Sequence, residues 1–285
     1  MSTKPPARSV TITLTRYAEP DELVSQAIAG ALLQEGVTGE ILFFDQNTSS
    51  TLSEADFEPG NLKLKVVRGS MRSLSDARNA AIDQAAHDTI LFLDSDAVPE
   101  TGWAKAMADT LANPKCAVAG SRIEPGWPAR PPAFAKARAL LDQYSLLDLG
   151  QEMRVVNKVV GAGFGMDRGK LSKGFKFDPE LGRRDGRLFG GEETDFCKRA
   201  QALGLEVHYC GEAAVTHLIQ PERMSWSWIA RRMVYAGYGR AQQGGAPSPS
   251  RALELADYLF MPFYLPPYAA GWIWGKFARQ GKASD

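Results

Sequence analysis

Two aspartates, Asp94 and Asp96, stand one residue apart directly after the apolar run 90–93. This run is predicted to be a buried strand, so both carboxylates would lie at the carboxyl end of a sheet strand. Divalent cations such as Mg²⁺ prefer oxygen ligands, and open α/β sheets bind ligands in the crevice outside these strand ends. The pair is therefore predicted to hold a divalent cation and, with it, a phosphorylated ligand. A turn or a helix cap is the simpler explanation of such a tripeptide when it stands alone.

A second group of carboxylates, Glu192, Glu193 and Asp195, follows the glycines Gly190 and Gly191. The three acids are predicted to lie in the first turn of a helix, where they would also compensate the helix dipole. Adjacent glycines let a backbone approach a ligand closely, and dipole compensation does not explain them. The pattern therefore indicates a general base that takes a proton from an alcohol nucleophile.

His217 and three arginines are further candidates for functional residues, and each also has a simpler structural explanation. His217 ends a predicted extended segment, where a neutral imidazole can bind a metal ion or a phosphate but is more often structural. Arg68, Arg72 and Arg78 flank the first carboxylate region. They form either a solvated basic face or contacts to a nucleotide diphosphate, which guanidinium groups bind strongly.

Alternating strand and helix patterns must position these residues, and they predict an α/β fold with a mostly parallel, doubly wound sheet. Three predicted strands end in polar residues, at Thr15, Asp45 and Asp94, so all three ends would face one crevice. The predicted strands are 9–15, 41–44, 62–67, 89–93, 117–121, 155–160 and 205–210, and the predicted helices are 22–34, 76–86, 99–112, 134–149, 192–203 and 225–240.

The overall composition excludes some classes of function. Lys and Arg together number 33, as do Asp and Glu, so a net charge of about zero gives no electrostatic argument for nucleic-acid binding. The three cysteines lack metal-ligand spacing, and their odd number fits a reducing compartment. Residues 1–10 hold no apolar segment of the kind that a secretory signal needs. We therefore expect a cytoplasmic protein.

The C-terminal part is aromatic, and residues 258–275 hold no charged side chain. This run approaches the length of a transmembrane helix, but its three prolines are expected to break a straight helix. The aromatic residues and the basic residues up to 282 are typical of a membrane interface. Contact of residues 258–282 with the inner face of the cell membrane is the favoured interpretation. A tail packed on the domain or on a partner subunit, and a true span, are the alternatives.

Taken in order, these features resemble glycosyltransferase family 2, whose members have the GT-A fold. The resemblance runs from about residue 10 to residue 217 and continues more weakly to residue 240. No single motif is decisive, whereas the ordered set with family-like spacing is specific. The matching residues are Thr15, Asp45, Ala77-Arg78-Asn79, Asp94-Ser95-Asp96, the segment 161–165, Phe177-Asp178-Pro179-Glu180-Leu181, the segment 191–199, the segment 204–209 and Val215-Thr216-His217.

The resemblance implies an inverting glycosyltransferase that uses a nucleotide-diphosphate sugar. Its catalytic base would be Glu193, although the family has Asp at this position, so the neighbouring Glu192 stays a candidate. Asp96 would hold Mn²⁺ or Mg²⁺, with Asp94 and His217 as further ligands. The nucleotide sugar would be bound by Thr15, Asp45, Arg78, Asp94 and Gly163.

The resemblance also implies an organisation and a set of partners. Residues 1–217 would form the nucleotide-sugar-binding and catalytic domain, with a single Rossmann-like sheet flanked by helices, and residues 218–285 a helical extension. The acceptor would be a glycan or a lipid-linked glycan in polysaccharide or glycolipid assembly, and a homodimer stays open. A nucleotidyltransferase or a non-catalytic binding protein on the same fold are the alternatives. The first of these should have a Gly-rich phosphate loop after the first strand, which residues 16–19 do not form.

Overall fold

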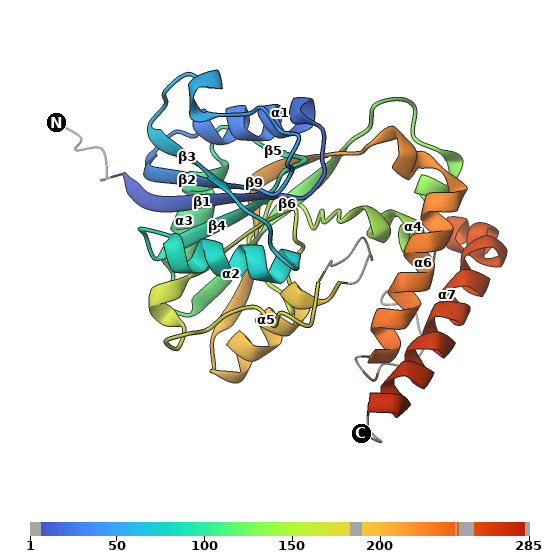
Figure 1. Cartoon of the computed structure of the whole chain (residues 1–285). Coiled ribbons are helices and arrows are strands. Elements are labelled where there is room, and N and C mark those ends of the chain that lie inside the picture. Colours follow the sequence, from blue (N-terminus) through green and yellow to red (C-terminus); the bar gives the residue numbers. More distant parts are fainter. Residues whose placement is uncertain (1–6, 183–189, 243, 245–253, 283–285) are drawn as a thin grey trace.

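A nine-stranded sheet organises the computed structural model, which describes residues 7–182, 190–242, 244 and 254–282 (Figure 1). Its strand order is β3-β2-β1-β4-β8-β6-β9-β5, and β7 pairs with β9 beside this path. Helices flank the sheet, as the alternating pattern predicted. The strands are β1 (Arg8–Arg16), β2 (Val37–Asp45), β3 (Leu62–Arg68), β4 (Thr89–Asp94), β5 (Ala97–Pro99), β6 (Cys116–Gly126), β7 (Arg154–Val155), β8 (Gly163–Asp167) and β9 (Glu206–Leu218).

Seven α-helices and five 3₁₀ turns connect and follow the strands in the described residues. The α-helices are α1 (Asp21–Leu32), α2 (Leu74–Gln84), α3 (Trp103–Leu111), α4 (Arg138–Leu141), α5 (Glu192–Ala202), α6 (Trp226–Gln242) and α7 (Leu255–Lys282). The 3₁₀ turns are η1 (Glu54–Asp56), η2 (Ala133–Lys136), η3 (Asp142–Tyr144), η4 (Arg168–Lys170) and η5 (Pro221–Met224).

The first four strands are parallel, and their register brings the predicted polar ends together. Arg16 pairs with Asp45 across β1 and β2, and Thr15 pairs with Asp94 across β1 and β4. Residues 90–93 of β4 are almost completely buried on both faces, which explains why that run is continuously apolar. The carboxyl ends of β1, β2 and β4 therefore form one polar edge of the sheet.

The middle of the sheet departs from the sequence prediction. The strand expected at 155–160 is reduced to the two residues of β7, and the glycine-containing segment after it forms β8 instead. β8 runs antiparallel to both β4 and β6. A Cβ atom on Gly165 would come within 2.6 Å of a Leu91 methyl carbon, so this strand enters the sheet because it has almost no side chain there. The intrinsic strand propensity of this segment did not predict β8, since glycine is depleted in strands.

The helix expected at 134–149 is broken into η2, α4 and η3. Ser145 has a left-handed backbone with φ of 58°, which ends the helical path. Phe134, Leu140 and Tyr144 are buried in one cluster with Ile229 of α6 and Tyr264 of α7. This segment therefore follows the surface of the C-terminal helices, and tertiary packing overrides its helical pattern.

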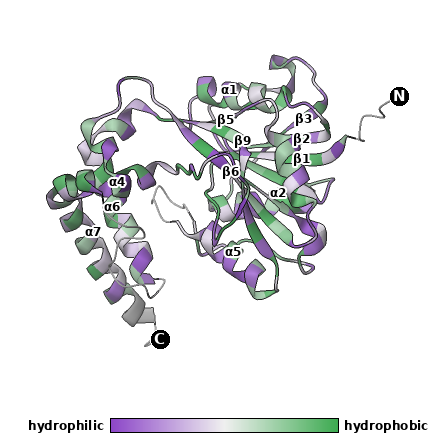
Figure 2. Ribbon diagram, turned by 180° about the vertical axis from the view of Figure 1, so that it is seen from behind, coloured by the Kyte–Doolittle hydropathy of each residue, from purple (hydrophilic) through white to green (hydrophobic). Residues whose placement is uncertain are grey.

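Helices α6 and α7 pack against each other as a long hairpin beside the sheet-containing body (Figures 1 and 2). The expected break at Pro262, Pro266 and Pro267 is wrong, because α7 continues through all three. Proline removes one backbone hydrogen bond and costs about 3 kcal/mol in an isolated helix. Extensive packing of α7 on α6 provides the compensation, since most helical stability in proteins comes from tertiary contacts.

Glycines set the close approach of these two helices. A Cβ atom on Gly271 would lie 1.9 Å from the carbonyl oxygen of Val234, and one on Gly237 would lie 2.0 Å from that of Tyr268. The side chain of any other residue would therefore push the backbones apart. Glycines at these positions thus allow the backbones of the two helices to lie close together.

Gly271→Leu is accordingly expected to destabilise the hairpin by at least about 3 kcal/mol, the upper range for overpacking, because the clash is with backbone and cannot relax by side-chain rotation. Urea unfolding followed by circular dichroism measures the loss. Ala270→Leu is the matched control, since Ala270 is the adjacent residue and is exposed. Equal stability of the two variants would contradict the close glycine packing.

Candidate active site

Two carboxylates and one imidazole converge at the polar edge of the sheet. Asp94 ends β4, and Asp96 follows two residues later, just before β5. β5 pairs with β9 so that Ala97 is opposite His217. One potential ligand atom from each of Asp94, Asp96 and His217 lies within 4.8 Å of the others. The structure therefore brings together the three predicted metal ligands, from two segments more than 100 residues apart.

The hydrogen bonds of His217 indicate what this cluster can hold. Its Nδ1 atom is 2.7 Å from the carbonyl oxygen of Tyr144, which can only accept, so Nδ1 carries a proton. Its Nε2 atom is 3.2 Å from a carboxylate oxygen of Asp96. With acceptors on both sides of the ring, Nε2 must either carry a second proton or face a cation. A histidine fixed in this way by a backbone carbonyl is typical of metal ligands.

When only protein groups surround His217, nearby charges determine its protonation state. Burial by itself would lower its pKa, but the adjacent Asp96 carboxylate outweighs burial and raises the pKa above its usual value. The cluster therefore attracts positive charge, and a proton on His217 partly supplies it. A divalent cation would supply more, so the donor set fits a metal such as Mn²⁺ or Mg²⁺.

Arg223 is a site residue that the sequence prediction missed. Its guanidinium group donates a hydrogen bond of 2.9 Å to the second carboxylate oxygen of Asp96. Arg223 lies in η5, the turn between β9 and α6, and the Tyr144 hydroxyl donates to its carbonyl oxygen at 2.7 Å. Its position six residues after His217, at the end of the extended segment, was the available signal. This cation could contact an anionic ligand held by Asp96.

Arg78 connects the metal candidates to the second acidic cluster. Its guanidinium group lies 2.8 Å from Glu193, 3.2 Å from Glu192 and 3.5 Å from Asp94. The side chain comes from α2 and is buried, with its guanidinium over the rings of Phe164 and Phe177. Arg78, which was predicted to bind the nucleotide sugar, thus forms ion pairs with three carboxylates of the site in this structure.

The two adjacent glutamates differ in accessibility. Helix α5 begins at Glu192, directly after Gly191, whose φ of 112° favours glycine. The Glu193 side chain is 15% exposed, whereas that of Glu192 is 4% exposed. Burial alone would raise the pKa of Glu193, but the Arg78 guanidinium outweighs it and holds the pKa below its usual value. Glu193 is therefore an ionised carboxylate with access to the outside, as a base requires.

Gly161 lies at these acids, whereas Gly163, which was predicted to bind the nucleotide sugar, does not. A Cβ atom on Gly161 would come within 2.3 Å of Glu193 Oε1 and 3.0 Å of the Arg78 guanidinium. Gly163 is buried in β8, where a Cβ atom would meet the side chains of Val215 and Ser121. Gly163 thus lets strands pack closely, and Gly161 leaves the space that the Glu193 carboxylate occupies.

The predicted nucleoside residues lie next to this centre along the sheet edge. Thr15 is the register neighbour of Asp94. The Asp45 carboxylate is buried, with Arg68 at 3.3 Å and Arg16 at 3.7 Å, and it accepts a hydrogen bond from the Asn47 amide at 3.0 Å. In this structure Asp45 therefore holds two arginines at the crevice. Both carboxylate oxygens of Asp45 already have partners, so a contact from Asp45 to a nucleobase would compete with them.

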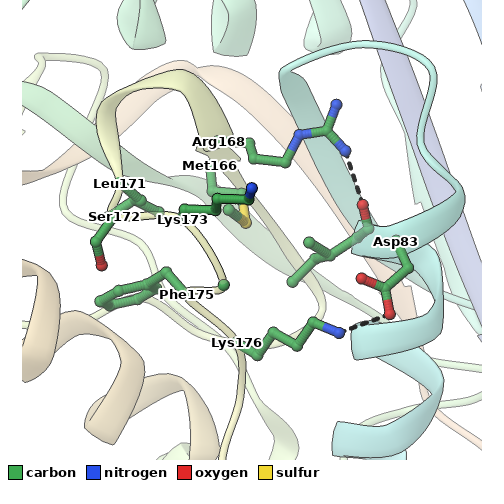
Figure 3. A pocket seen from close by; sticks show the side chains of 10 residues that line it. Asp83, Met166, Arg168, Leu171, Ser172, Lys173, Phe175 and Lys176 are labelled. Atoms are coloured by element: carbon green, nitrogen blue, oxygen red, sulfur yellow. Dashed lines mark hydrogen bonds and ion pairs between the residues drawn. The ribbon is translucent and has the colours of Figure 1, made fainter.

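A cavity of about 400 Å³ lies elsewhere, between the end of α2 and the segment after β8 (Figure 3). Two of its basic residues already have acidic partners: Lys176 is 2.6 Å from Asp83, and Arg168 is 2.9 Å from Asp88. Met166 of its lining is near the start of β4, because it pairs with Ile90. The cavity is therefore at the opposite edge of the sheet from Asp94 and is no part of the candidate site.

Replacement of Arg78 is expected to shift the pH dependence of activity. Without its cation, burial dominates and the pKa of Glu193 rises, so the carboxylate is lost at a higher pH. Because a base acts only while ionised, activity falls as the pH drops through this pKa, and the acid limb of Arg78→Met should move to higher pH. Arg78→Lys keeps the charge and is the control. An unshifted limb in a folded Arg78→Met enzyme would show that Arg78 does not set the ionisation of the base.

Comparison with solved structures identifies the class of fold. A crystal structure described as GalNAc-T7 with UDP, GalNAc and Mn²⁺ matches 91% of this chain and 55% of that chain, with a TM-score of 0.61 and 12% sequence identity. At this identity the likeness concerns the fold, which is that of GT-A glycosyltransferases.

The sequence comparisons then identify the family. The model of glycosyl transferase family 2 matches residues 12–175, more than half of the chain, and this protein belongs to that family. Two curated relatives, the pre-mycofactocin glycosyltransferases of Mycobacterium tuberculosis strains CDC 1551 / Oshkosh and ATCC 25618 / H37Rv, are each 23% identical over 232 residues. The alignment covers 81% of this chain, which spans about half the length of these relatives.

Proposed function

We propose that this protein transfers a sugar from a nucleotide-diphosphate sugar to an acceptor hydroxyl, with inversion at the anomeric carbon. The observation that carries the proposal is the meeting of a cation-attracting cluster, Asp94, Asp96 and His217, with an ionised and accessible carboxylate, Glu193. The first is suited to a diphosphate leaving group, and the second to an attacking alcohol. Arg78 contacts both parts.

In this mechanism the acceptor oxygen attacks the anomeric carbon on the side opposite the diphosphate, and one direct displacement inverts the configuration. Glu193 takes the hydroxyl proton as the new bond forms. The carbon–oxygen bond to the diphosphate breaks, and its electron pair leaves with the nucleoside diphosphate. Arg78 keeps Glu193 ionised before the reaction, and Gly161 leaves room beside it.

We further propose that Mn²⁺ or Mg²⁺ is bound by Asp96, Asp94 and His217. Such an ion would neutralise the charge that develops on the leaving diphosphate. Arg223 adds a fixed positive charge at the same place, because its guanidinium is hydrogen-bonded to Asp96. GalNAc-T7, which shares the fold, was crystallised with UDP and Mn²⁺, and this supports a donor and a cofactor of the same chemical kind.

The nucleoside would lie along Thr15 and Asp45, which continue the sheet edge away from the metal candidates. The acceptor would enter from the side of Glu193, between the body of residues 1–217 and the extension of residues 218–285. We propose a glycan or lipid-linked acceptor in polysaccharide or glycolipid assembly. The curated relatives are named for a different acceptor, pre-mycofactocin, so family membership leaves the acceptor of this chain to experiment.

Binding and hydrolysis of UDP-, GDP- and dTDP-linked sugars with Mn²⁺, Mg²⁺ or EDTA test the proposal. Calorimetry should show binding of one donor that EDTA abolishes, and slow hydrolysis should release the matching nucleoside diphosphate. Binding without hydrolysis or transfer, to any acceptor supplied, would support a non-catalytic nucleotide-sugar-binding protein instead. Absence of binding to every donor with either metal would overturn the proposed function.

A further inference from the structure

Helix α7 exposes an apolar face along its whole length. Its outer face, defined here by Leu255, Leu259, Phe263, Ile273, Trp274 and Phe277, has side chains between 44% and 87% exposed. Residues spaced by three or four positions lie on one side of a helix, and Pro266 and Ala270 continue this side between Phe263 and Ile273. Large exposed apolar surfaces of this kind mark sites of interaction.

The opposite side of α7 is already used inside the chain. Tyr264, Gly271 and Gly275 are buried against α6 and its neighbours. The outer face stays largely exposed after the hairpin has formed, although the rings of Trp274 and Phe263 also contact Tyr238 and Trp226 of α6. Of the other large exposed apolar residues in the described part of the chain, Trp226, Tyr258 and Leu265 also belong to the hairpin, whereas others, such as Leu33 and Leu203, are on the sheet-containing body.

The charges at the end of α7 indicate what covers this face. No acidic residue occurs between Asp257 and Asp285, whereas Lys276, Arg279 and Lys282 are basic. A second copy of this chain would bring the same basic and apolar segment and no acid within it. Anionic lipid headgroups would provide both an apolar layer and negative charge, worth about 1 kcal/mol per basic residue near the surface.

We propose that the outer face of α7 lies in the interface of an anionic lipid bilayer. Among the described residues, no helix has the length and apolar character needed to cross a bilayer, which suits an orientation along the surface. Aromatic rings such as that of Trp274 prefer the headgroup level of a membrane. The exposed Lys276 follows directly and would reach the headgroups.

Two contacts connect this surface with the candidate active site. The ring of Phe263 lies 5.4 Å from that of Trp226 at the start of α6. Three residues earlier, Arg223 is hydrogen-bonded to Asp96. If the proposed function holds, a lipid-linked acceptor in the same membrane would therefore be near the site, but membrane binding itself does not depend on catalysis.

Flotation of the full-length protein with vesicles tests the proposal. The vesicles are phosphatidylcholine with or without phosphatidylglycerol. The wild type should float with the anionic vesicles, and Leu259→Gln/Phe263→Gln/Phe277→Gln should bind at least about tenfold more weakly, since burial of one large apolar side chain already corresponds to about this factor. The matched control, Leu33→Gln/Val155→Gln/Leu203→Gln, changes equally exposed residues of the body and should bind like the wild type.

A second arm tests the charge. Lys276→Glu/Arg279→Glu/Lys282→Glu should weaken binding to anionic vesicles, and added salt should weaken binding of the wild type. Circular dichroism must show that all variants remain folded. Equal flotation of the wild type and the outer-face variant would overturn the proposal. The proposal would also be overturned if the wild type did not bind vesicles but formed dimers, measured by light scattering, that the outer-face variant could not form. In that case a second copy of the chain would cover the face.

Discussion

Glu193→Gln is expected to lower the turnover number for sugar transfer by about 10²- to 10⁴-fold, the usual contribution of a general base. Gln keeps the shape of the side chain but cannot take a proton from the acceptor. Arg78 still has Glu192 and Asp94 as partners, so the fold should be retained. Affinity for the donor should change little, because Glu193 acts on the acceptor. Steady-state transfer kinetics and calorimetry with the donor measure the two effects separately.

Glu192→Gln is the matched control for this prediction. Glu192 is the more buried of the two glutamates and also pairs with Arg78, so its loss should affect stability more than turnover. The reverse result, with Glu192→Gln inactive and Glu193→Gln active, would assign the base to Glu192. Near-normal turnover in both variants would show that neither glutamate is the base.

Asp96→Asn is expected to weaken metal-dependent donor binding by more than about 100-fold, because even the outer partners of metal ligands contribute about 10- to 100-fold. Asp96 has His217 at one carboxylate oxygen and Arg223 at the other. The substitution removes the negative charge that both of these groups face. Titration of Mn²⁺ and donor into the variant, followed by calorimetry, measures the loss.

Asp109→Asn is the control for Asp96→Asn, since Asp109 is an exposed carboxylate that pairs with Arg8 and Lys105 on the surface. Removal of one member of a buried ion pair costs about 3–5 kcal/mol, so thermal unfolding must show that Asp96→Asn is folded at the assay temperature. If folded Asp96→Asn bound Mn²⁺ and donor as tightly as the wild type, Asp96 would not be a metal ligand.

The order of elements and one edge of the site could be predicted from sequence alone. Residues 90–93 are apolar on both faces, a pattern that only a doubly covered strand requires, and Asp94 follows at its end. Parallel strands place all their carboxyl ends on one edge, so Thr15, Asp45 and Asp94 had to lie along the same edge, and the register confirms this. These conclusions depend on local periodicity and on a general property of parallel sheets.

The tertiary structure decided which distant groups meet. His217 reaches Asp96 because β5 and β9 pair, and Arg223 reaches it because η5 turns back toward the sheet. Arg78 joins Asp94 to Glu193 across α2 and α5, so it is a partner of the acids in a way that a list of basic residues cannot show. Salt-bridge partners depend on side-chain direction in space, which short-range sequence patterns do not encode.

Packing also overruled local propensity in three segments. β8 formed from a glycine-containing run, the helix expected at 134–149 broke into short turns, and α7 continued through three prolines. In each case the energy of burial against neighbours exceeded an intrinsic preference of about 1–3 kcal/mol. The sequence by itself therefore determined the parallel strands β1 to β4, their polar edge and the apolar character of the C-terminal part. The long-range contacts that assemble the acids, the cations and the helical hairpin were decided by the tertiary structure.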